Sequence, residues 1–217
     1  MIKRLLRFCH ISEDGDKVII VAFFACILFI FIFPGKLPFF IVVFLFFLMF
    51  FRDPARRIAH NPLSIISPAD GRVADIDVVD MPDIGKSPFV RIGIFLSILN
   101  VHVQRFPYSG EVMKIEYKRG KFYPAFKKEL SQRNESNTVV IKTDSDFLIV
   151  VKQIAGLIAR RIKCKAVVGK KNVKGDRMGI IMFGSRVELY VKSDTPLFVK
   201  VGDKVIGGET IIGMMKR

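Results

Sequence analysis

The sequence is poor in cysteine and histidine. Its three cysteines, Cys9, Cys26 and Cys164, lie far apart and form no C-x-x-C pair. This spacing argues against a disulfide framework and a structural zinc site, and it is typical of a reducing compartment. The sequence also lacks repeats and low-complexity linkers. Its 217 residues have room for one ordinary domain and an appendage.

Acidic residues are scarce as well, with 20 Asp and Glu against 35 Lys and Arg, so the formal net charge is +15. A basic balance fits either nucleic acid or a membrane. Because 51% of the residues are hydrophobic and include a long uncharged stretch, anionic lipid is the favoured partner. The chain carries no nucleic-acid-binding motif beyond its charge, so we predict an anionic membrane surface and no nucleic acid.

The apolar stretch near the N-terminus is interrupted. Residues 18–33 carry no charge, Pro34-Gly35-Lys36-Leu37-Pro38 follows, and residues 39–51 are apolar again. One straight helix over both arms would measure roughly 50 Å, against about 30 Å for a hydrocarbon core. Two prolines around a glycine favour a bend. We therefore predict a membrane-associated helical hairpin over residues 1–52, which either spans the bilayer or dips into it.

Basic residues flank this hairpin on both sides. They are Lys3, Arg4 and Arg7 before it, and Arg52, Arg56 and Arg57 after it. The positive-inside rule then keeps both ends in the cytoplasm. A cleaved signal peptide is disfavoured, because Glu13-Asp14-Gly15-Asp16 precedes the apolar run and a second apolar arm follows it. We predict a cell-membrane protein whose remaining domain lies at the cytoplasmic face.

Residues 53–217 have the composition of a globular domain rich in extended segments. Apolar and alternating runs predict strands at 65–66, 72–76, 89–96, 111–117, 138–143, 147–153, 180–183 and 187–191. Residues 154–163 have apolar side chains at helical spacing and are the best helix candidate. Short strands and Gly-Asp or Gly-Gly turns close the chain over residues 199–213. The predicted fold class is mainly β, with one or two helices after the hairpin.

The dipeptide Gly184-Ser185 lies where the chain must bend between two of these strands. Glycine lets a neighbouring group approach its carbonyl closely, and serine places a hydroxyl beside it. These are the groups that a chain needs to attack its own peptide bond. Taken alone, however, the dipeptide is most often only a turn.

Five stretches in a fixed order favour the chemical interpretation. They are Phe50-Phe51-Arg52-Asp53-Pro54, Ser67-Pro68-Ala69-Asp70-Gly71-Arg72-Val73, Asn100-Val101-His102-Val103, Gln153-Ile154-Ala155-Gly156 with Ala159-Arg160-Arg161-Ile162, and Phe183-Gly184-Ser185-Arg186-Val187. Through them the chain resembles phosphatidylserine decarboxylase, the pyruvoyl-dependent enzyme, and more closely its short form. The ending also resembles the barrel-sandwich fold of lipoyl and biotinyl carriers, a likeness that the family shares.

The resemblance implies a precursor that cuts itself between Gly184 and Ser185. In the family, the serine hydroxyl attacks the preceding carbonyl to give an ester, and β-elimination with hydrolysis leaves a pyruvoyl group. Residues 1–184 and 185–217 would then be the two subunits of a heterodimer, with further oligomerisation left open. The pyruvoyl group from Ser185 would form a Schiff base with phosphatidylserine and take up the electrons released on decarboxylation. No free cofactor is then required, and no metal is predicted.

Two further residues are candidates for the chemistry. His102 lies between valines, a pattern more often structural, but within the resemblance it is a candidate base because histidine titrates near neutrality. The longer branch of the family has two histidines three apart here, whereas this chain has His102 and Arg105. Whether His102 serves self-cleavage, decarboxylation or both therefore stays open. Asp70 is either a turn carboxylate or, by the family's pattern, the residue that orients the histidine in self-cleavage. His10 and His60 lie outside the motifs.

A basic run between residues 160 and 177 is either a solvated face or a contact with the bilayer, and the hairpin favours the bilayer. Its members are Arg160, Arg161, Lys163, Lys165, Lys170, Lys171, Lys174 and Arg177.

A rival function is a membrane-anchored, non-enzymatic carrier or adaptor with a lipoyl-like β domain. A carrier needs a modifiable lysine at an exposed hairpin tip, and Val112-Met113-Lys114-Ile115 is only an imperfect match. It would also have no use for Gly184-Ser185. The resemblance therefore predicts an enzyme that decarboxylates phosphatidylserine to phosphatidylethanolamine and CO2.

Overall fold

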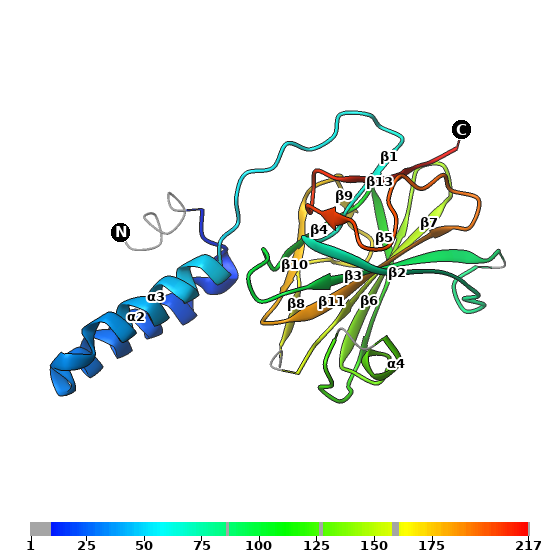
Figure 1. Cartoon of the computed structure of the whole chain (residues 1–217). Coiled ribbons are helices and arrows are strands. Elements are labelled where there is room, and N and C mark those ends of the chain that lie inside the picture. Colours follow the sequence, from blue (N-terminus) through cyan, green and yellow to red (C-terminus); the bar gives the residue numbers. More distant parts are fainter. Residues whose placement is uncertain (1–9, 86, 126–127, 158–160, 217) are drawn as a thin grey trace. The chain divides into compact units, whose positions relative to one another are not determined.

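The computed structural model describes residues 10–85, 87–125, 128–157 and 161–216 (Figure 1). The chain divides into two compact units, Met1–Ala55 and Arg56–Arg217. Cys9, the basic residues Lys3, Arg4 and Arg7 before the hairpin, and Ala159 and Arg160 of the fourth motif lie outside the described residues.

The first unit is a helical hairpin. Helix α2 runs over Asp16–Ile32 and α3 over Leu37–Phe50, with the short 3-10 helix η2, Pro34–Lys36, between them. Their contact is aromatic: the rings of Phe29 and Phe40 stack with centroids 5.7 Å apart. The predicted bend at the prolines is therefore confirmed.

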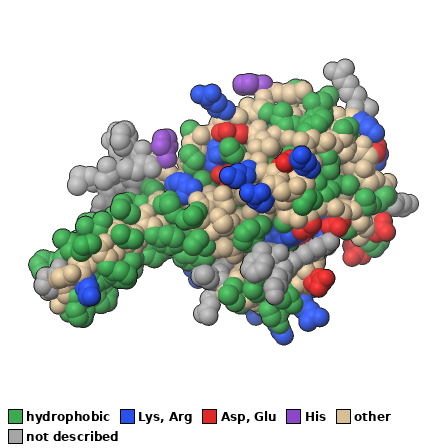
Figure 2. Space-filling model, in the orientation of Figure 1, with side chains coloured by type: hydrophobic (Ala, Val, Ile, Leu, Met, Phe, Trp, Pro, Cys, Tyr) green, Lys and Arg blue, Asp and Glu red, His purple; other side chains and the backbone are tan. Residues whose placement is uncertain are grey.

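The outer surface of this hairpin is hydrophobic, as Figure 2 shows. With the 3-10 helix η1, Glu13–Gly15, the first arm is 20 residues long and only 17% of its most apolar window is buried. At 1.5 Å per residue it measures about 30 Å, the thickness of a hydrocarbon core. It is thus long and apolar enough to cross a membrane, whereas α3, with 14 residues, is shorter.

The second unit is built on an eight-stranded antiparallel sheet. Its strands, in spatial order, are β12 (Lys204–Val205), β2 (Gly71–Val79), β3 (Phe89–Leu96), β11 (Ser185–Lys192), β7 (Leu148–Ile154), β6 (Ser136–Lys142), β5 (Gly110–Lys118) and β9 (Lys171–Asn172). Two smaller sheets accompany it. They are β4 (Val103–Arg105), β10 (Arg177–Ile181) and β8 (Ile162–Cys164), and the pair β1 (Ser64–Ile66) with β13 (Ile211–Met214).

The core lies on one face of the large sheet, and the smaller sheets contribute to it. On the central strand β11, Val187, Leu189 and Val191 belong to this core, together with Met178 of β10 and Ile212 of β13. Since side chains alternate along a strand, Arg186, Glu188 and Tyr190 point to the opposite face. The mainly β fold class and the predicted strands are confirmed.

The helix predicted over residues 154–163 is wrong. Ile154 is the last residue of β7, and Ile162 begins β8, where it pairs with Ile181 of β10. Ile154 and Ile162 thus belong to two different strands, Leu157 lies in neither helix nor strand, and Ile158 lies outside the described residues. The helical spacing of these side chains is therefore accidental. The helix that the structure does describe in this unit, α4 (Lys128–Ser131), has only four residues.

Candidate active site

Ser185 is the first residue of β11, a strand inside the large sheet with β3 on one side and β7 on the other. It pairs with Leu96, the last residue of β3. The side chain is fully buried, and its hydroxyl oxygen has no hydrogen-bond partner within the described part of the chain. A buried hydroxyl without a hydrogen-bond partner lowers the stability of the folded protein. Such a group in a folded protein calls for an explanation, and it makes Ser185 a candidate for chemistry.

The bend before Ser185 is made by Phe183, whose φ of 67° lies in the left-handed region. Gly184 itself does not have a positive φ, and a Cβ on it would meet Ile98 Cγ2 at an ordinary 3.7 Å. The steric requirement lies instead at Gly156, because a Cβ there would overlap the carbonyl oxygen of Gly184. The Gly184 carbonyl is therefore closely approached by the backbone of Gly156. The predicted attack on it by the Ser185 hydroxyl stays a prediction.

Several loops meet at the end of the sheet where Ser185 lies. The strand registers place the end of β3 beside Ser185 and the end of β7 beside Arg186. The start of β6 pairs with the ends of both β7 and β5. The Gly184-Ser185 bond thus lies at the end of the sheet from which residues 97–102, 119–125, 155–157 and 182–184 extend.

His102 is fully buried in the loop before β4. Its ring nitrogen Nδ1 lies 2.9 Å from the carbonyl oxygen of Asn100. The Asn100 side chain in turn accepts hydrogen bonds from the backbone N–H and the hydroxyl of Ser97, at 2.9 and 2.8 Å. The loop that carries His102 is therefore tied to the end of β3, the strand that pairs with Ser185.

A chain of buried amides also holds His102. The Gln104 side chain donates to the His102 carbonyl at 2.6 Å and accepts from Gln153 at 2.9 Å. Asn137 donates to the Gln153 side chain at 3.0 Å. Gln153 lies on β7 opposite Val187, so this chain links His102 to the strands around Ser185. Sequence reasoning missed these residues, although Gln153 stands inside a matching motif and Gln104 beside His102.

Asp70 makes its hydrogen bonds with Arg56 and Gly207. Both of its carboxylate oxygens lie 2.9 Å from Nη2 of Arg56, and Oδ1 accepts the Gly207 N–H at 2.8 Å. Asp70 therefore joins distant segments instead of capping its own turn. The orienting role that the resemblance implies for Asp70 stays a prediction, and Arg56 is a partner that sequence reasoning missed.

A buried ionic cluster occupies the opposite face of β11, starting next to Ser185. Arg186 is fully buried; its Nη2 lies 2.6 Å from Asp75 and its Nε 2.9 Å from Glu188. Gly93 makes room for this guanidinium, since a Cβ there would overlap it. Burial lowers the pKa of Arg186, but the hydrogen bond with Asp75 and the charge of Glu188 outweigh burial, so the pKa is raised.

Tyr190 completes this cluster by donating from its hydroxyl to Glu188 Oε2 at 2.6 Å. Burial, followed by the negative charge of Glu188, raises the pKa of Tyr190. Lys152 on β7 lies opposite Glu188, and burial lowers the pKa of its ammonium group. The first residues of β11 are thus anchored by charges on one face and by the apolar core on the other.

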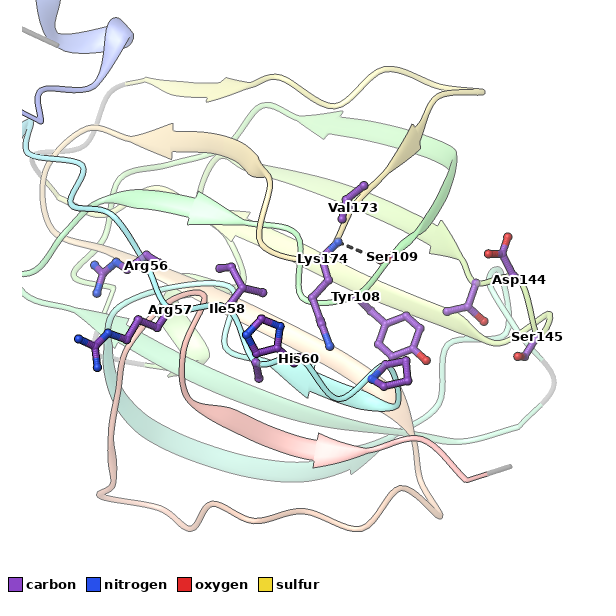
Figure 3. A pocket seen from close by; sticks show the side chains of 13 residues that line it. Arg56, Arg57, Ile58, His60, Tyr108, Ser109, Asp144, Ser145, Val173 and Lys174 are labelled. Carbon is purple, nitrogen blue, oxygen red and sulfur yellow. Dashed lines mark hydrogen bonds between the residues drawn. The ribbon is translucent and has the colours of Figure 1, made fainter.

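A cavity of about 1040 Å³ lies elsewhere on this unit (Figure 3). Its lining includes Arg56, Arg57, His60, Tyr108 and Lys174, but neither Ser185 nor His102. Lys174 Nζ already donates to the Asn61 carbonyl and the Ser64 hydroxyl. Within the described ranges, His, Cys, Asp and Glu side chains form no group of three that could hold a metal ion.

The sequence matches known proteins of one family. The family model of phosphatidylserine decarboxylase matches residues 43–213. The phosphatidylserine decarboxylase proenzyme of Wolbachia pipientis is 46% identical over 172 residues, which cover 77% of this chain and 75% of that protein. The proenzyme of Anaplasma phagocytophilum is 42% identical over 207 residues, covering 94% and 91%. That of Ehrlichia chaffeensis is 41% identical over 214 residues, covering 98% and 95%.

Proposed function

The chain belongs to the phosphatidylserine decarboxylase family, and we propose that it converts phosphatidylserine to phosphatidylethanolamine and CO2. The matched region includes Ser185, His102 and Asp70. The names of the relatives favour this enzyme over the carrier or adaptor, and they describe proenzymes. The word proenzyme fits a precursor that becomes active by cleaving itself.

The proposed maturation starts at the buried Ser185 hydroxyl, the observation that carries the proposal. The oxygen attacks the Gly184 carbonyl carbon, its proton passes to a base, and the peptide C–N bond breaks to leave an ester and a free amine. Loss of the Ser185 α-proton then breaks the Cβ–O bond and releases residues 1–184 as a carboxylate. Water addition and loss of ammonia from the remaining dehydroalanine give the pyruvoyl group at the start of residues 185–217.

The geometry around Ser185 suits this sequence of steps. The Gly184 carbonyl lies against Gly156, in a space that a side chain would fill. The β11 strand is paired on both sides and anchored through Arg186, so residues 185–217 can stay in the sheet after the cut. A pyruvoyl group held there supplies a carbonyl that condenses with an amine and accepts the electrons of a breaking C–C bond.

His102 and Asp70 are proposed to take part in proton transfer from the Ser185 hydroxyl. His102 is the candidate base for the Ser185 hydroxyl, and the amide chain through Gln104 and Gln153 restrains the loop that carries it. Asp70 is proposed to orient the histidine during self-cleavage. Its bonds to Arg56 and Gly207 fix its carboxylate.

The hairpin supports a membrane location for the protein. Helix α2 with η1 has the length and composition of a membrane span. We place the second unit at the cytoplasmic face, because basic residues flank both ends of the hairpin.

The intact mass of the purified protein, with a Ser185→Ala control, tests the proposal. We expect two fragments ending at Gly184 and starting at residue 185, the smaller with a pyruvoyl mass and a blocked N-terminus, and a single uncut chain for the control. Release of CO2 from carboxyl-labelled phosphatidylserine should follow the cut protein only. A folded, membrane-bound chain that stays whole would contradict the maturation and favour the carrier.

A further inference from the structure

Because phosphatidylserine is a membrane lipid, its reacting carboxyl group lies in the headgroup layer of a bilayer. If the proposed function holds, on which this inference rests, the end of the sheet that carries Ser185 has to reach that layer. The hairpin can tether the enzyme to the membrane, but a tether does not by itself present this end to the lipid. A surface that presents this end would have to lie on the loops around Ser185.

Three large apolar side chains are exposed on two of these loops. Ile98, Leu99 and Leu157 have 41%, 61% and 61% of their surface exposed. We call these residues the apolar rim. Ile98 lies beside Gly184, since a Cβ on that glycine would be 3.7 Å from Ile98 Cγ2. Leu157 follows Gly156, which lies against the Gly184 carbonyl. Ile98 thus contacts the position of Gly184, and Leu157 is the chain neighbour of the residue that approaches its carbonyl.

Exposed basic side chains lie at the same end of the sheet as the rim. Lys118 is the last residue of β5 and pairs with the start of β6. Lys121 forms an isolated β-bridge with Asn134, and the Asn134 side chain donates a hydrogen bond to the Ala155 carbonyl. The Arg161 carbonyl accepts a hydrogen bond from the N–H of Met182, next to the bend before Ser185. Among the described residues, the exposed basic side chains at this end include Lys118, Arg119, Lys121, Arg133 and Arg161. Figure 2 shows hydrophobic and basic side chains side by side at the end where Figure 1 places α4.

We propose that the apolar rim and its basic border form a membrane-docking surface for a bilayer that contains anionic phospholipid. The rim enters the headgroup layer, the basic side chains contact the lipid phosphates, and the headgroup of one lipid then lies at Ser185. This combination of apolar tips and cationic border is what binds proteins to anionic membrane interfaces. The structure also divides the predicted basic run: Arg161 lies at this end, whereas Lys171 lies at the far end of the sheet, paired with Asp144.

The far end of the sheet offers a matched control. Val167 and Val168 are 57% and 58% exposed in the turn before β9, between Lys165 and Lys170. They resemble the rim in exposure and in their basic neighbours, but β9 pairs with the start of β5, away from Ser185. If any exposed apolar pair beside lysines promoted docking, this turn would act as the rim does.

The first test compares Leu99→Ser/Leu157→Ser with Val167→Ser/Val168→Ser in the full-length protein. After intact mass has shown maturation, turnover is measured on phosphatidylserine in anionic vesicles and on short-chain phosphatidylserine below its critical micelle concentration. We expect the rim variant to lose about tenfold or more on vesicles and to change less than about twofold on the dispersed lipid. The control should match the wild type on both. Equal losses on both substrates, no loss on vesicles, or an equal loss in the control would overturn the proposal.

A second test does not depend on activity. An environment-sensitive fluorophore is attached at Leu99→Cys, or at Val168→Cys as the control, in full-length protein whose three native cysteines are replaced by serine. With anionic vesicles, we expect a blue shift and quenching by lipid-borne quenchers at position 99 but not at 168. The same spectra at both positions would refute docking through the rim. A blue shift at position 99 in a protein that decarboxylates neither substrate would instead support docking and reject the proposed function.

Discussion

At the residue scale, the position of the Gly184 carbonyl depends on the absence of a side chain at Gly156. Gly184 lies at the predicted cut, yet it has room for a Cβ, and Phe183 provides the left-handed backbone. Gly156, 28 residues earlier in the sequence, is where a Cβ would overlap the carbonyl that has to be attacked. Gly156 is therefore a positioning residue for self-cleavage under the proposed function.

We expect Gly156→Ala to slow self-cleavage by about tenfold or more, because the new methyl group would push the Gly184 carbonyl away from its place by a large fraction of an ångström. The measurement is a time course of the appearance of fragments 1–184 and 185–217. Gly184→Ala is the matched comparison, since its Cβ meets only ordinary contacts, and it should cleave faster than Gly156→Ala. Cleavage of Gly156→Ala at the wild-type rate would show that this contact does not matter.

At the scale of elements, β11 is held differently on its two faces. Its core face carries Val187 and Leu189, and its other face carries Arg186, Glu188 and Tyr190 in a buried ionic cluster. Buried charges destabilise a protein strongly when one partner is removed. The strand that begins at the proposed cut is therefore fixed in register by both packing and charge pairing.

The cluster predicts a pH dependence of stability. The pKa of Tyr190 is raised in the folded protein, so folding favours its protonated hydroxyl. This contribution to stability is fully present below about pH 10, the ordinary tyrosine pKa, and is lost as the pH rises above that value. Tyr190→Phe should remove this loss. It should also cost about 1–3 kcal/mol near pH 8, because Glu188 loses a buried hydrogen bond.

Thermal unfolding of the detergent-solubilised protein between pH 8 and 11 measures this effect. The wild type should lose more stability than Tyr190→Phe above pH 10. Tyr108, whose pKa burial also raises, and Lys152 are present in both proteins and cancel in the comparison. Parallel curves over this range would show that the Tyr190 hydroxyl is not the group responsible.

At the scale of the whole molecule, the proposed function assigns membrane attachment to the first unit and the chemistry to the second. The contacts described around Ser185, including Gly156, Gln153 and Arg186, all lie within residues 56–217. The hairpin contributes the exposed apolar helices.

Deleting residues 1–52 should therefore leave self-cleavage intact while weakening attachment to membranes. Arg56, the partner of Asp70, remains in this variant. We expect both fragments by intact mass and a loss of about tenfold or more in co-sedimentation with vesicles, relative to the full chain. A shortened protein that folds but stays uncut would place part of the maturation machinery in the hairpin.

The sequence by itself determined the parts of this protein that depend on local patterns. Charge-free runs around Pro34 and Pro38 predicted the hairpin. Apolar and alternating runs predicted strands such as β3, β5, β7 and β11, because burial leaves such patterns in the sequence. The order of the motifs indicated the family and pointed to Gly184-Ser185. Local patterns failed at residues 154–163, where the spacing of apolar residues matched a helix by chance.

Only the tertiary structure decided which residues meet. The bonds of Asp70 with Gly207 and of Arg186 with Asp75 join positions 137 and 111 residues apart. The approach of Gly156 to the Gly184 carbonyl and the amide chain behind His102 likewise cross between strands and loops. No periodicity encodes such pairs, because they arise from the register and the order of strands in the sheet. Strand order is set by packing of the whole core, which is why the surroundings of Ser185 became visible only in the folded chain.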